Sequence, residues 1–453
     1  MLRLTWTQPE DLLPHALAAA EADGQDVSAL SERWRRAGGS TLAPASGATP
    51  NAATEALRKL ARDLLSEIDA LPVPERFRHD EPDNLAAILM AGPAEASGLS
   101  RATTFDRVHG AWLGRAAGCL LGKPVEKIPR EGIRMIAQST GNWPIGGYFT
   151  EVGLDPELAA RYPWNRRSRS TSLAENINGM PEDDDLNFPL IALDLLERLG
   201  ASFTTDDVAQ SWLANLPGGR VFTAERIAYR NLLDGYEPEI AGAVRNPFRD
   251  WIGAQIRTDV YGWACPGDPR RAAGLAWTDG WLSHRRNGLY GAMFAAAASS
   301  AAVVARTVDE VIDAGLSVVP ERSRYAAAIR RGRALGRENN AVDDAFDALH
   351  TEFGRLHWVH VLNNAALLAF SLTRSRGDFP QAIALAVTGG WDTDSVGATA
   401  GSICGALAGA SALPAEWIEP LHNRLASSIP GFDGSAFDDL ARRTLVVAES
   451  IRS

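Results

Sequence analysis

Two runs of glycine at four-residue spacing constrain the fold of this chain more than any other feature of its sequence. The runs are Gly110, Gly114, Gly118 and Gly122, and then Gly397, Gly401, Gly405 and Gly409. Residues four apart share one face of an α-helix, where each glycine costs about 0.5–1 kcal/mol relative to alanine. Close approach of two helix backbones would offset these costs. We therefore predict two helices that pack tightly near one another in the core.

Helical periodicity continues through the chain beyond residue 105. Apolar residues recur every three or four positions in the segments 190–199, 326–335, 359–372 and 440–451. Alternating runs of β-branched residues are scarce, so we predict an all-α core. The uncharged stretch 287–305 consists mostly of alanine, glycine and serine. Its weak hydrophobicity favours a buried helix over a membrane span.

A predicted boundary close to residue 100 divides the chain. Segment 38–48 and a second stretch near 92–98 are rich in residues that interrupt helices. Charged, helix-favouring segments occur at 12–22 and 53–70, and the second has an amphipathic pattern. We predict a mostly helical accessory segment over 1–100 and a main helical domain over 101–453. The sequence leaves open whether the accessory segment covers a cleft, forms an oligomer contact or recognises a partner protein.

Charge and cysteine content restrict the partners and the compartment. The formal net charge is −11, which disfavours nucleic acid and anionic membranes as partners. The three cysteines, Cys119, Cys265 and Cys404, are far apart and form no CxxC motif, so we interpret them as small buried side chains in a reducing compartment. The first 24 residues lack the apolar core of a signal peptide. We expect a cytoplasmic protein, and the sequence makes no prediction for its oligomeric state.

The first acidic box is a run of four adjacent carboxylates that precedes an apolar helical pattern. It consists of Glu182, Asp183, Asp184 and Asp185. Acidic residues at a helix start can simply favour the helix dipole, and Pro189 is tolerated if it lies in the first turn. The helix that follows is apolar enough to be buried, however, and buried adjacent carboxylates require cations. Hard oxygen ligands suit Mg²⁺, Mn²⁺ or Ca²⁺.

The second acidic box, GGWDTDS at 389–395, stands directly before the second glycine run. Its polar residues are Asp392, Asp394 and Ser395. Asp394 or Ser395 alone could be a helix cap without catalytic function. Because two acidic boxes each open an apolar or small-residue helix, a shared metal site explains both boxes together better than capping does.

These motifs together resemble the ADP-ribosylglycohydrolase family. The matching segments are GAWLGRAAGCLLGKPVE at 110–126, the EDDD box at 182–185 and GGWDTDSVGATAGSICGALAG at 389–409. The resemblance spans about residues 105–425, and no counterpart is identified for 1–100. It implies an all-α, orthogonal multi-helix bundle that holds two Mg²⁺ ions, with Mn²⁺ as an alternative. It also implies hydrolysis of a glycosidic bond at the anomeric carbon of an ADP-ribosyl group on a small-molecule or ADP-ribosylated substrate.

The resemblance also implies roles for particular residues. The implied metal ligands are Glu182, Asp183, Asp184, Asp392, Asp394 and Ser395, with Glu182 at the position of a hydroxyl residue in the family. Asp183 or Asp184 would serve as general acid or base, and the sequence does not choose between them. The implied substrate-binding residues are Glu126, Trp391, His284 and Asn364. A purely structural role is the alternative for His284 and Asn364.

Departures from the family pattern keep other functions open. The first box carries extra negative charge at Glu182 and Asp185, Cys119 stands where many members have aspartate, and Trp391 is inserted in the second box. An aromatic ring at that position could stack on a base or sugar. From the resemblance as a whole we expect a metal-dependent hydrolase that acts on an ADP-ribosyl or related ribosyl group. The alternatives are an N-ribosyl hydrolase of a nucleoside- or nucleotide-like metabolite and a non-catalytic module that binds ADP-ribose.

Overall fold

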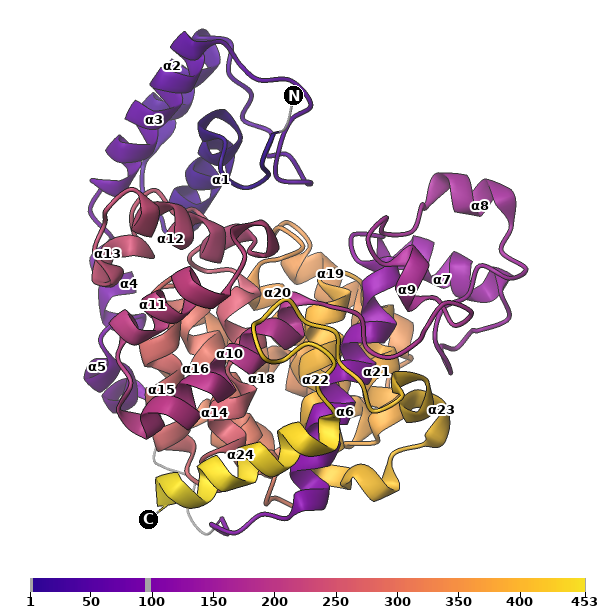
Figure 1. Cartoon of the computed structure of the whole chain (residues 1–453). Helices are drawn as coiled ribbons and strands as arrows, with labels where there is room; N and C mark the ends of the chain where they lie inside the picture. The colour runs from indigo at the N-terminus through magenta and orange to yellow at the C-terminus, as the bar shows by residue number, and fades with distance from the viewer. Residues whose placement is uncertain (1–2, 94–98, 453) are drawn as a thin grey trace.

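Almost every element of the chain is a helix (Figure 1). The computed structural model describes residues 3–93 and 99–452. The first helices are α1 (Pro9–Ala22), α2 (Ser28–Arg36), α3 (Glu55–Asp69), α4 (Glu75–Asp80) and α5 (Leu85–Ala91). The following ones are α6 (Phe105–Gly122), α7 (Arg130–Ser139), α8 (Pro156–Arg161), α9 (Arg169–Ser172), α10 (Asp184–Leu199), α11 (Thr205–Asn215), α12 (Thr223–Leu233), α13 (Pro238–Ala241), α14 (Asp259–Trp263) and α15 (Pro269–Gly280). The last are α16 (Asn287–Ala302), α17 (Val308–Leu316), α18 (Arg324–Arg337), α19 (Val342–Phe353), α20 (Val361–Ser375), α21 (Phe379–Thr388), α22 (Thr393–Ala408), α23 (Ala415–Ile418) and α24 (Phe437–Arg452).

Short 3-10 helices and isolated bridges complete the secondary structure. The 3-10 helices are η1 (Lys123–Val125), η2 (Gly200–Ser202), η3 (Gly218–Arg220), η4 (Ile252–Arg257), η5 (Ala410–Ala412) and η6 (Glu419–Leu421). The described residues form no β-strand, and the bridges join Met180 to Leu425, Trp251 to His360 and Leu425 to Ser435. The predicted all-α fold is therefore confirmed. Residues 94–98 of the expected break lie outside the described part of the chain.

The two glycine runs form the contact between α6 and α22, which lie side by side at the centre of the molecule (Figure 1). The helices run antiparallel, so that Gly114 faces Gly401 and Gly118 faces Gly397. A Cβ atom built on Gly114 would lie 2.9 Å from the carbonyl carbon of Gly401, and one on Gly118 would lie 2.6 Å from that of Gly397. No side chain fits there, and the predicted tight pair is confirmed. Gly409 differs from the prediction because it follows the end of α22 with φ of +83°.

Helix α16 confirms the expected buried helix in the stretch 287–305. Every residue of α16, from Asn287 to Ala302, is buried. Its small side chains let α14, α15 and α17 approach it closely. Among the described residues, no helix has the length and hydropathy that a membrane span requires.

Helix α10 directs the first acidic box toward the helix pair. Pro189 lies in the second turn of α10, one turn later than the expected position. Because proline has no N–H, the carbonyl oxygen of Asp185 lacks its partner within the helix. The Nε atom of Arg115, on α6, donates to this oxygen at 2.8 Å. The carbonyl oxygen that Pro189 leaves without a helical partner thus links α10 to α6.

Aromatic side chains fix the start of the N-terminal segment to the rest of the molecule. The ring of Trp6 lies 5.5 Å from Phe248, 5.7 Å from Trp251 and 5.9 Å from His357 between centroids. His15, on α1, enters the same cluster at 5.2 Å from Phe248. Figure 1 shows α1, α2 and α3 above α12 and α13, with α4 and α5 continuing down one side. The predicted loop at 38–48 is confirmed.

A buried ionic network holds the middle of the same segment. Asp23 accepts from Arg324 at 3.0 Å and from Arg249 at 3.2 Å, and it also pairs with Arg286. Glu81 pairs with Arg324 at 2.7 Å. Removing one member of such a buried network would leave uncompensated charge. The accessory segment is therefore docked by both apolar and ionic contacts, although whether residues 1–100 fold as a separate domain stays a prediction.

Candidate functional site

Both acidic boxes open into one cavity of about 260 Å³. It lies where the end of α6, the start of α10 and the start of α22 meet. Carboxylates reach the cavity from three directions, because each of these three helices has one end at the cavity wall. The acidic residues on its wall are Glu126, Asp183, Asp184, Asp185, Glu225, Asp392 and Asp394. Seven carboxylates around so small a volume repel one another unless cations compensate them.

Three of these carboxylates form the first candidate metal group. One oxygen each from Glu126, Asp392 and Asp394 lies within 4.8 Å of the others. Glu126 follows η1, Asp392 stands immediately before α22, and Asp394 lies in its first turn. Burial, together with repulsion by Glu126, raises the pKa of Asp394 to about 7. Burial and the charge of Asp394 raise the pKa of Asp392 well above its usual value. Both shifts mark a site where negative charge lacks compensation.

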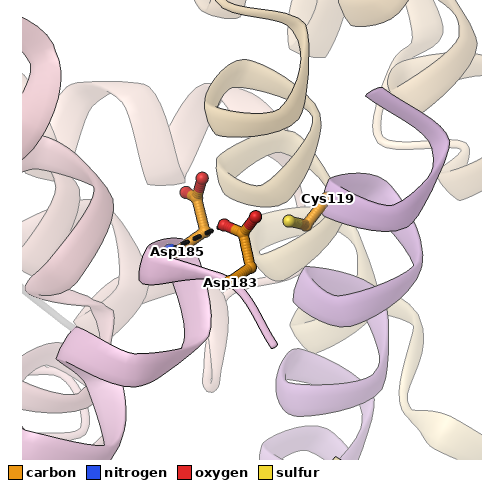
Figure 2. A group of neighbouring side chains, drawn as sticks. All are labelled: Cys119, Asp183 and Asp185. Atoms are coloured by element: carbon orange, nitrogen blue, oxygen red, sulfur yellow. Dashed lines mark hydrogen bonds between the residues drawn. The ribbon is translucent and has the colours of Figure 1, made fainter. Parts of the chain in front are cut away.

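The second candidate group joins α6 to the start of α10. Figure 2 shows Cys119, Asp183 and Asp185 pointing toward one another, and their ligand atoms lie within 4.8 Å of each other. Asp183 caps α10 by accepting from the N–H of Asp185 at 2.9 Å, the dashed line in Figure 2. A sulfur atom beside two carboxylates is a poorer site for Mg²⁺ than three oxygens.

Cations of the chain itself already occupy this second group. The ammonium of Lys123 pairs with the carboxylate of Asp183 and donates to the carbonyl oxygen of Glu182 at 3.3 Å. The guanidinium of Arg115 pairs with Asp185 at 3.2 Å and with Asp259 at 2.9 Å. The two groups therefore differ in charge, because the first has no buried basic side chain paired to it among the described residues.

Asp183 and Asp184 have opposite pKa shifts. Burial alone would raise the pKa of Asp183, but the ammonium of Lys123 outweighs burial and lowers it. Burial and the neighbouring charge of Asp183 raise the pKa of Asp184 well above its usual value. Among the described residues, the carboxylate of Asp184 has no hydrogen-bond or ion-pair partner. Two adjacent carboxyl groups with separated pKa values are the arrangement from which acid and base roles arise.

Comparison with known proteins decides the family. The family model described as ADP-ribosylglycohydrolase matches residues 100–452, more than three quarters of the chain. The chain belongs to the ADP-ribosylglycohydrolase family. A solved structure titled "ADP-ribosylglycohydrolase-related protein complex" is similar to it at 20% identity and a TM-score of 0.44, covering 77% of this chain and 98% of its own. A search of curated proteins found no significant match.

The structure separates Glu182 from the other residues of the first acidic box. The Glu182 carboxylate accepts from Asn187 at 3.1 Å and from the N–H of Ser428 at 3.2 Å, and it pairs with Arg220 at 2.9 Å. It therefore joins α10 to the loop between η6 and α24 rather than lining the cavity. Ser395 does line the cavity, and its hydroxyl donates to Asp185 at 3.3 Å.

The predicted substrate-binding residues lie at different depths in the structure. Asn364 donates to the carbonyl oxygens of Trp358 and His360 at 2.8 Å each and accepts from the N–H of Asp392 at 3.3 Å. It thus positions the second acidic box from behind. His284 is fully buried, with Nδ1 2.8 Å from the Ser283 hydroxyl and Nε2 3.9 Å from Glu225. Burial and the nearby Arg257 lower the pKa of His284 well below its usual value.

Trp391 faces a second cavity of about 800 Å³. Its ring stacks on His350 with centroids 4.3 Å apart. Arg130 and Arg134 line the same cavity, and Lys127 and Trp358 line both cavities. The two spaces therefore share a wall, and a ligand longer than a ribosyl group has room beside the acidic site. Of the four predicted substrate-binding residues, Glu126 alone lines the smaller cavity.

Sequence reasoning missed several residues of the site. Lys123 follows the first glycine run directly, and a charged residue at the end of a buried helix was the available signal. Glu225 on α12 lines the cavity and pairs with Arg257 at 2.7 Å, but nothing in its local sequence distinguishes it. Thr5 and Trp6 of the accessory segment also line the cavity. Arg226 holds this segment by donating to Thr5 at 2.8–2.9 Å.

Proposed function

We propose that this chain is a divalent-metal-dependent hydrolase that cleaves the glycosidic bond at the anomeric carbon of an ADP-ribosyl or related ribosyl group. The observation that carries the proposal is the meeting of Glu126, Asp392 and Asp394 with the unpaired carboxyl group of Asp184 in one cavity. The first three residues supply a cation site and the fourth supplies a proton. Hydrolysis through an oxocarbenium-like transition state needs both kinds of group.

The donor set fits a hard cation. Three carboxylates converge, two of them buried and with raised pKa values, so a divalent ion would remove repulsion that the protein leaves uncompensated. Oxygen donors of this type suit Mg²⁺, with Mn²⁺ as a close substitute. When bound, the ion supplies electrostatic stabilisation and orients the hydroxyl groups of the substrate. Asn364 holds the Asp392 loop in place for this function.

Asp184 is the proposed general acid and base. Burial and the charge of Asp183 raise the pKa of Asp184, which favours its protonated form, and its carboxyl group faces the cavity. Asp183 is unsuited to the role because Lys123 keeps it ionised and engaged. A proton held at Asp184 can pass to the leaving group, and the resulting carboxylate can then accept a proton from water.

The sizes and positions of the two cavities support an ADP-ribosyl substrate. The smaller cavity has room for a ribosyl group, and the adjoining cavity of about 800 Å³ has room for a diphosphate and a base. Arg130 and Arg134 on its wall are paired with Asp343 at 2.6 and 2.8 Å, and a bound diphosphate would compete for them. Trp391 would then lie on the second part of the substrate. On this basis we expect a small-molecule or ADP-ribosylated substrate.

One observation favours the alternative of a nucleoside- or nucleotide-like substrate. Thr5, Trp6 and Ser46 of the accessory segment form part of the wall of the smaller cavity. The indole N–H of Trp358 also donates to the carbonyl oxygen of Ala45 at 3.3 Å. A wall at this place restricts access for a folded protein and favours a compact metabolite.

A turnover screen with product identification tests these proposals. The purified chain is incubated with Mg²⁺ and ADP-ribosyl-arginine, ADP-ribosyl-serine, O-acetyl-ADP-ribose, nucleosides or nucleotides, and products are identified by mass spectrometry. Release of ADP-ribose that stops with chelator supports the leading proposal, and release of ribose or ribose phosphate supports the alternative. Metal binding without turnover would instead indicate a binding module.

A matched pair of variants on α10 assigns the proton-transfer role. Asp184→Asn should abolish turnover while metal binding persists. Asp194→Asn should leave turnover unchanged, because Asp194 lies on the same helix but pairs with Arg198 at 2.8 Å outside the cavity. Equal activity of the two variants would remove Asp184 from the mechanism.

A further inference from the structure

The position of Lys123 distinguishes the two carboxylate groups of the cavity. Lys123 begins η1 directly after α6, and its side chain is buried, with 7% of the residue exposed. Its ammonium has two partners, the carboxylate of Asp183 and the carbonyl oxygen of Glu182. A buried ammonium is retained only where negative groups compensate its desolvation. Lys123 is thus a cation that the fold builds into the acidic cavity.

The balance of charge leaves one place for a divalent ion. Beside α10, Asp183 is paired with Lys123, and Asp185 is paired with Arg115. The sulfur of Cys119 fills the third side of this group, and sulfur is a weak ligand for Mg²⁺. The group of Glu126, Asp392 and Asp394, in contrast, consists only of carboxylates.

The nearest cation to the all-carboxylate group is at its rim. Lys127 contacts Glu126 at 3.2 Å, but its side chain is 46% exposed and can move into solvent. An incoming metal ion therefore displaces no buried cation at Glu126, Asp392 and Asp394. At Asp183, an incoming ion would have to displace the ammonium of Lys123.

We propose that the ammonium of Lys123 permanently occupies the cation position beside Asp183, so that the chain binds one divalent ion, at Glu126, Asp392 and Asp394, instead of two. This inference rests on the proposed function. Asp183 then serves as the counter-ion of Lys123, and the ammonium provides fixed positive charge on the side of the cavity where α10 begins. Lys123 is a positioning residue that replaces a metal ion.

Metal stoichiometry tests this proposal without any substrate. The purified full chain is titrated with MnCl₂ by calorimetry, and bound Mn²⁺ is counted by elemental analysis after equilibrium dialysis. We expect one Mn²⁺ per wild-type chain. Two ions per wild-type chain would overturn the proposal, whatever the behaviour of the variants.

Substitution of the lysine adds a second, independent readout. Lys123→Met keeps the length of the side chain and removes its charge, so Asp183 becomes free and the stoichiometry should rise to two. The electron paramagnetic resonance spectrum should then change from that of an isolated Mn²⁺ to that of two coupled ions. The control Lys127→Met removes the cation at the rim, and this variant should still bind one Mn²⁺ per chain. A Lys123→Met protein that still binds one ion would also overturn the proposal.

The same titrations separate failure of this inference from failure of the proposed function. No Mn²⁺ bound to the wild-type chain, or binding unaffected by Asp392→Asn, would contradict the metal site itself. Suppose instead that the wild-type chain binds two ions, and that Asp392→Asn and Asp183→Asn each weaken binding. That result would support a metal site and contradict only the role assigned to Lys123.

Discussion

Replacing Gly118 with alanine inserts a methyl group into the contact between α6 and α22. The new Cβ atom would lie 2.6 Å from the carbonyl carbon of Gly397 and 3.2 Å from the nitrogen of Ala398. Non-bonded carbon atoms prefer about 3.5–4.0 Å, so the two helices would have to separate by roughly 1 Å. The opposing atoms belong to a helix backbone, and no side-chain rotation can relieve the clash.

The expected cost follows from two opposing effects. Overfilling a close-packed interior costs about 1–3 kcal/mol, and a backbone neighbour places this site at the upper end. The greater helix propensity of alanine stabilises the folded chain by about 0.5–1 kcal/mol. The net loss in the free energy of unfolding should therefore be about 2 kcal/mol. Separation of the helices would also move Glu126 away from Asp392, so Mg²⁺ affinity should fall in the same variant.

Gly274 provides the matched control. It lies inside α15, and a Cβ atom built on it would have no neighbour within 4 Å. Gly274→Ala should therefore stabilise the chain by about 0.5–1 kcal/mol through helix propensity alone. Urea denaturation followed by circular dichroism compares the two variants with the wild-type chain. A Gly118→Ala protein as stable as Gly274→Ala would refute the backbone-contact reasoning.

Further outcomes follow from the acidic site and from the aromatic cluster of the accessory segment. Asp392→Ala and Asp394→Ala should each abolish tight Mg²⁺ binding in a protein that still folds, and calorimetry that shows unchanged affinity in both would remove the second box from the site. Burial lowers the pKa of His15 from about 6.5 to about 4 in the folded chain, so the unfolded chain binds more protons between these values and stability falls as the pH falls through this window. At pH 5 the loss from His15 is about 2 kcal/mol. Denaturation at pH 7 and pH 5 should show a smaller acid-induced loss for His15→Phe than for the exposed control His79→Phe, and equal losses would contradict the assignment.

The glycine pair could be predicted from the sequence because its signal is both local and reciprocal. Four-residue spacing defines a helix face, and the cost of each glycine requires a partner that approaches the backbone. The end of the second run was less predictable. Gly409 keeps the spacing but has φ of +83°, so the backbone leaves the helix there.

The meeting of the two acidic boxes was predictable, but the orientation of their side chains was not. Which of four adjacent carboxylates faces the cavity depends on where α10 begins, and Asp183 takes the capping position. Glu182 is then directed outward to Arg220. A one-residue difference in the helix start changes the face of every side chain in the box.

Long-range contributions to the site have no sequence pattern. Lys123 is a single lysine, and its role depends on a carboxylate 60 positions later. Thr5 reaches the cavity through Arg226, which lies 221 positions away. Such contacts arise only from the packing of the complete chain, and spacing within a segment does not encode them.

Anomalous diffraction from crystals of the full chain grown with Mn²⁺ tests the central claim most directly. We predict a single anomalous peak within coordination distance of Glu126, Asp392 and Asp394, with the ammonium of Lys123 still beside Asp183. A crystal with no peak at these three carboxylates, although Mn²⁺ is present at saturating concentration, would contradict the account of the two acidic boxes as one metal site.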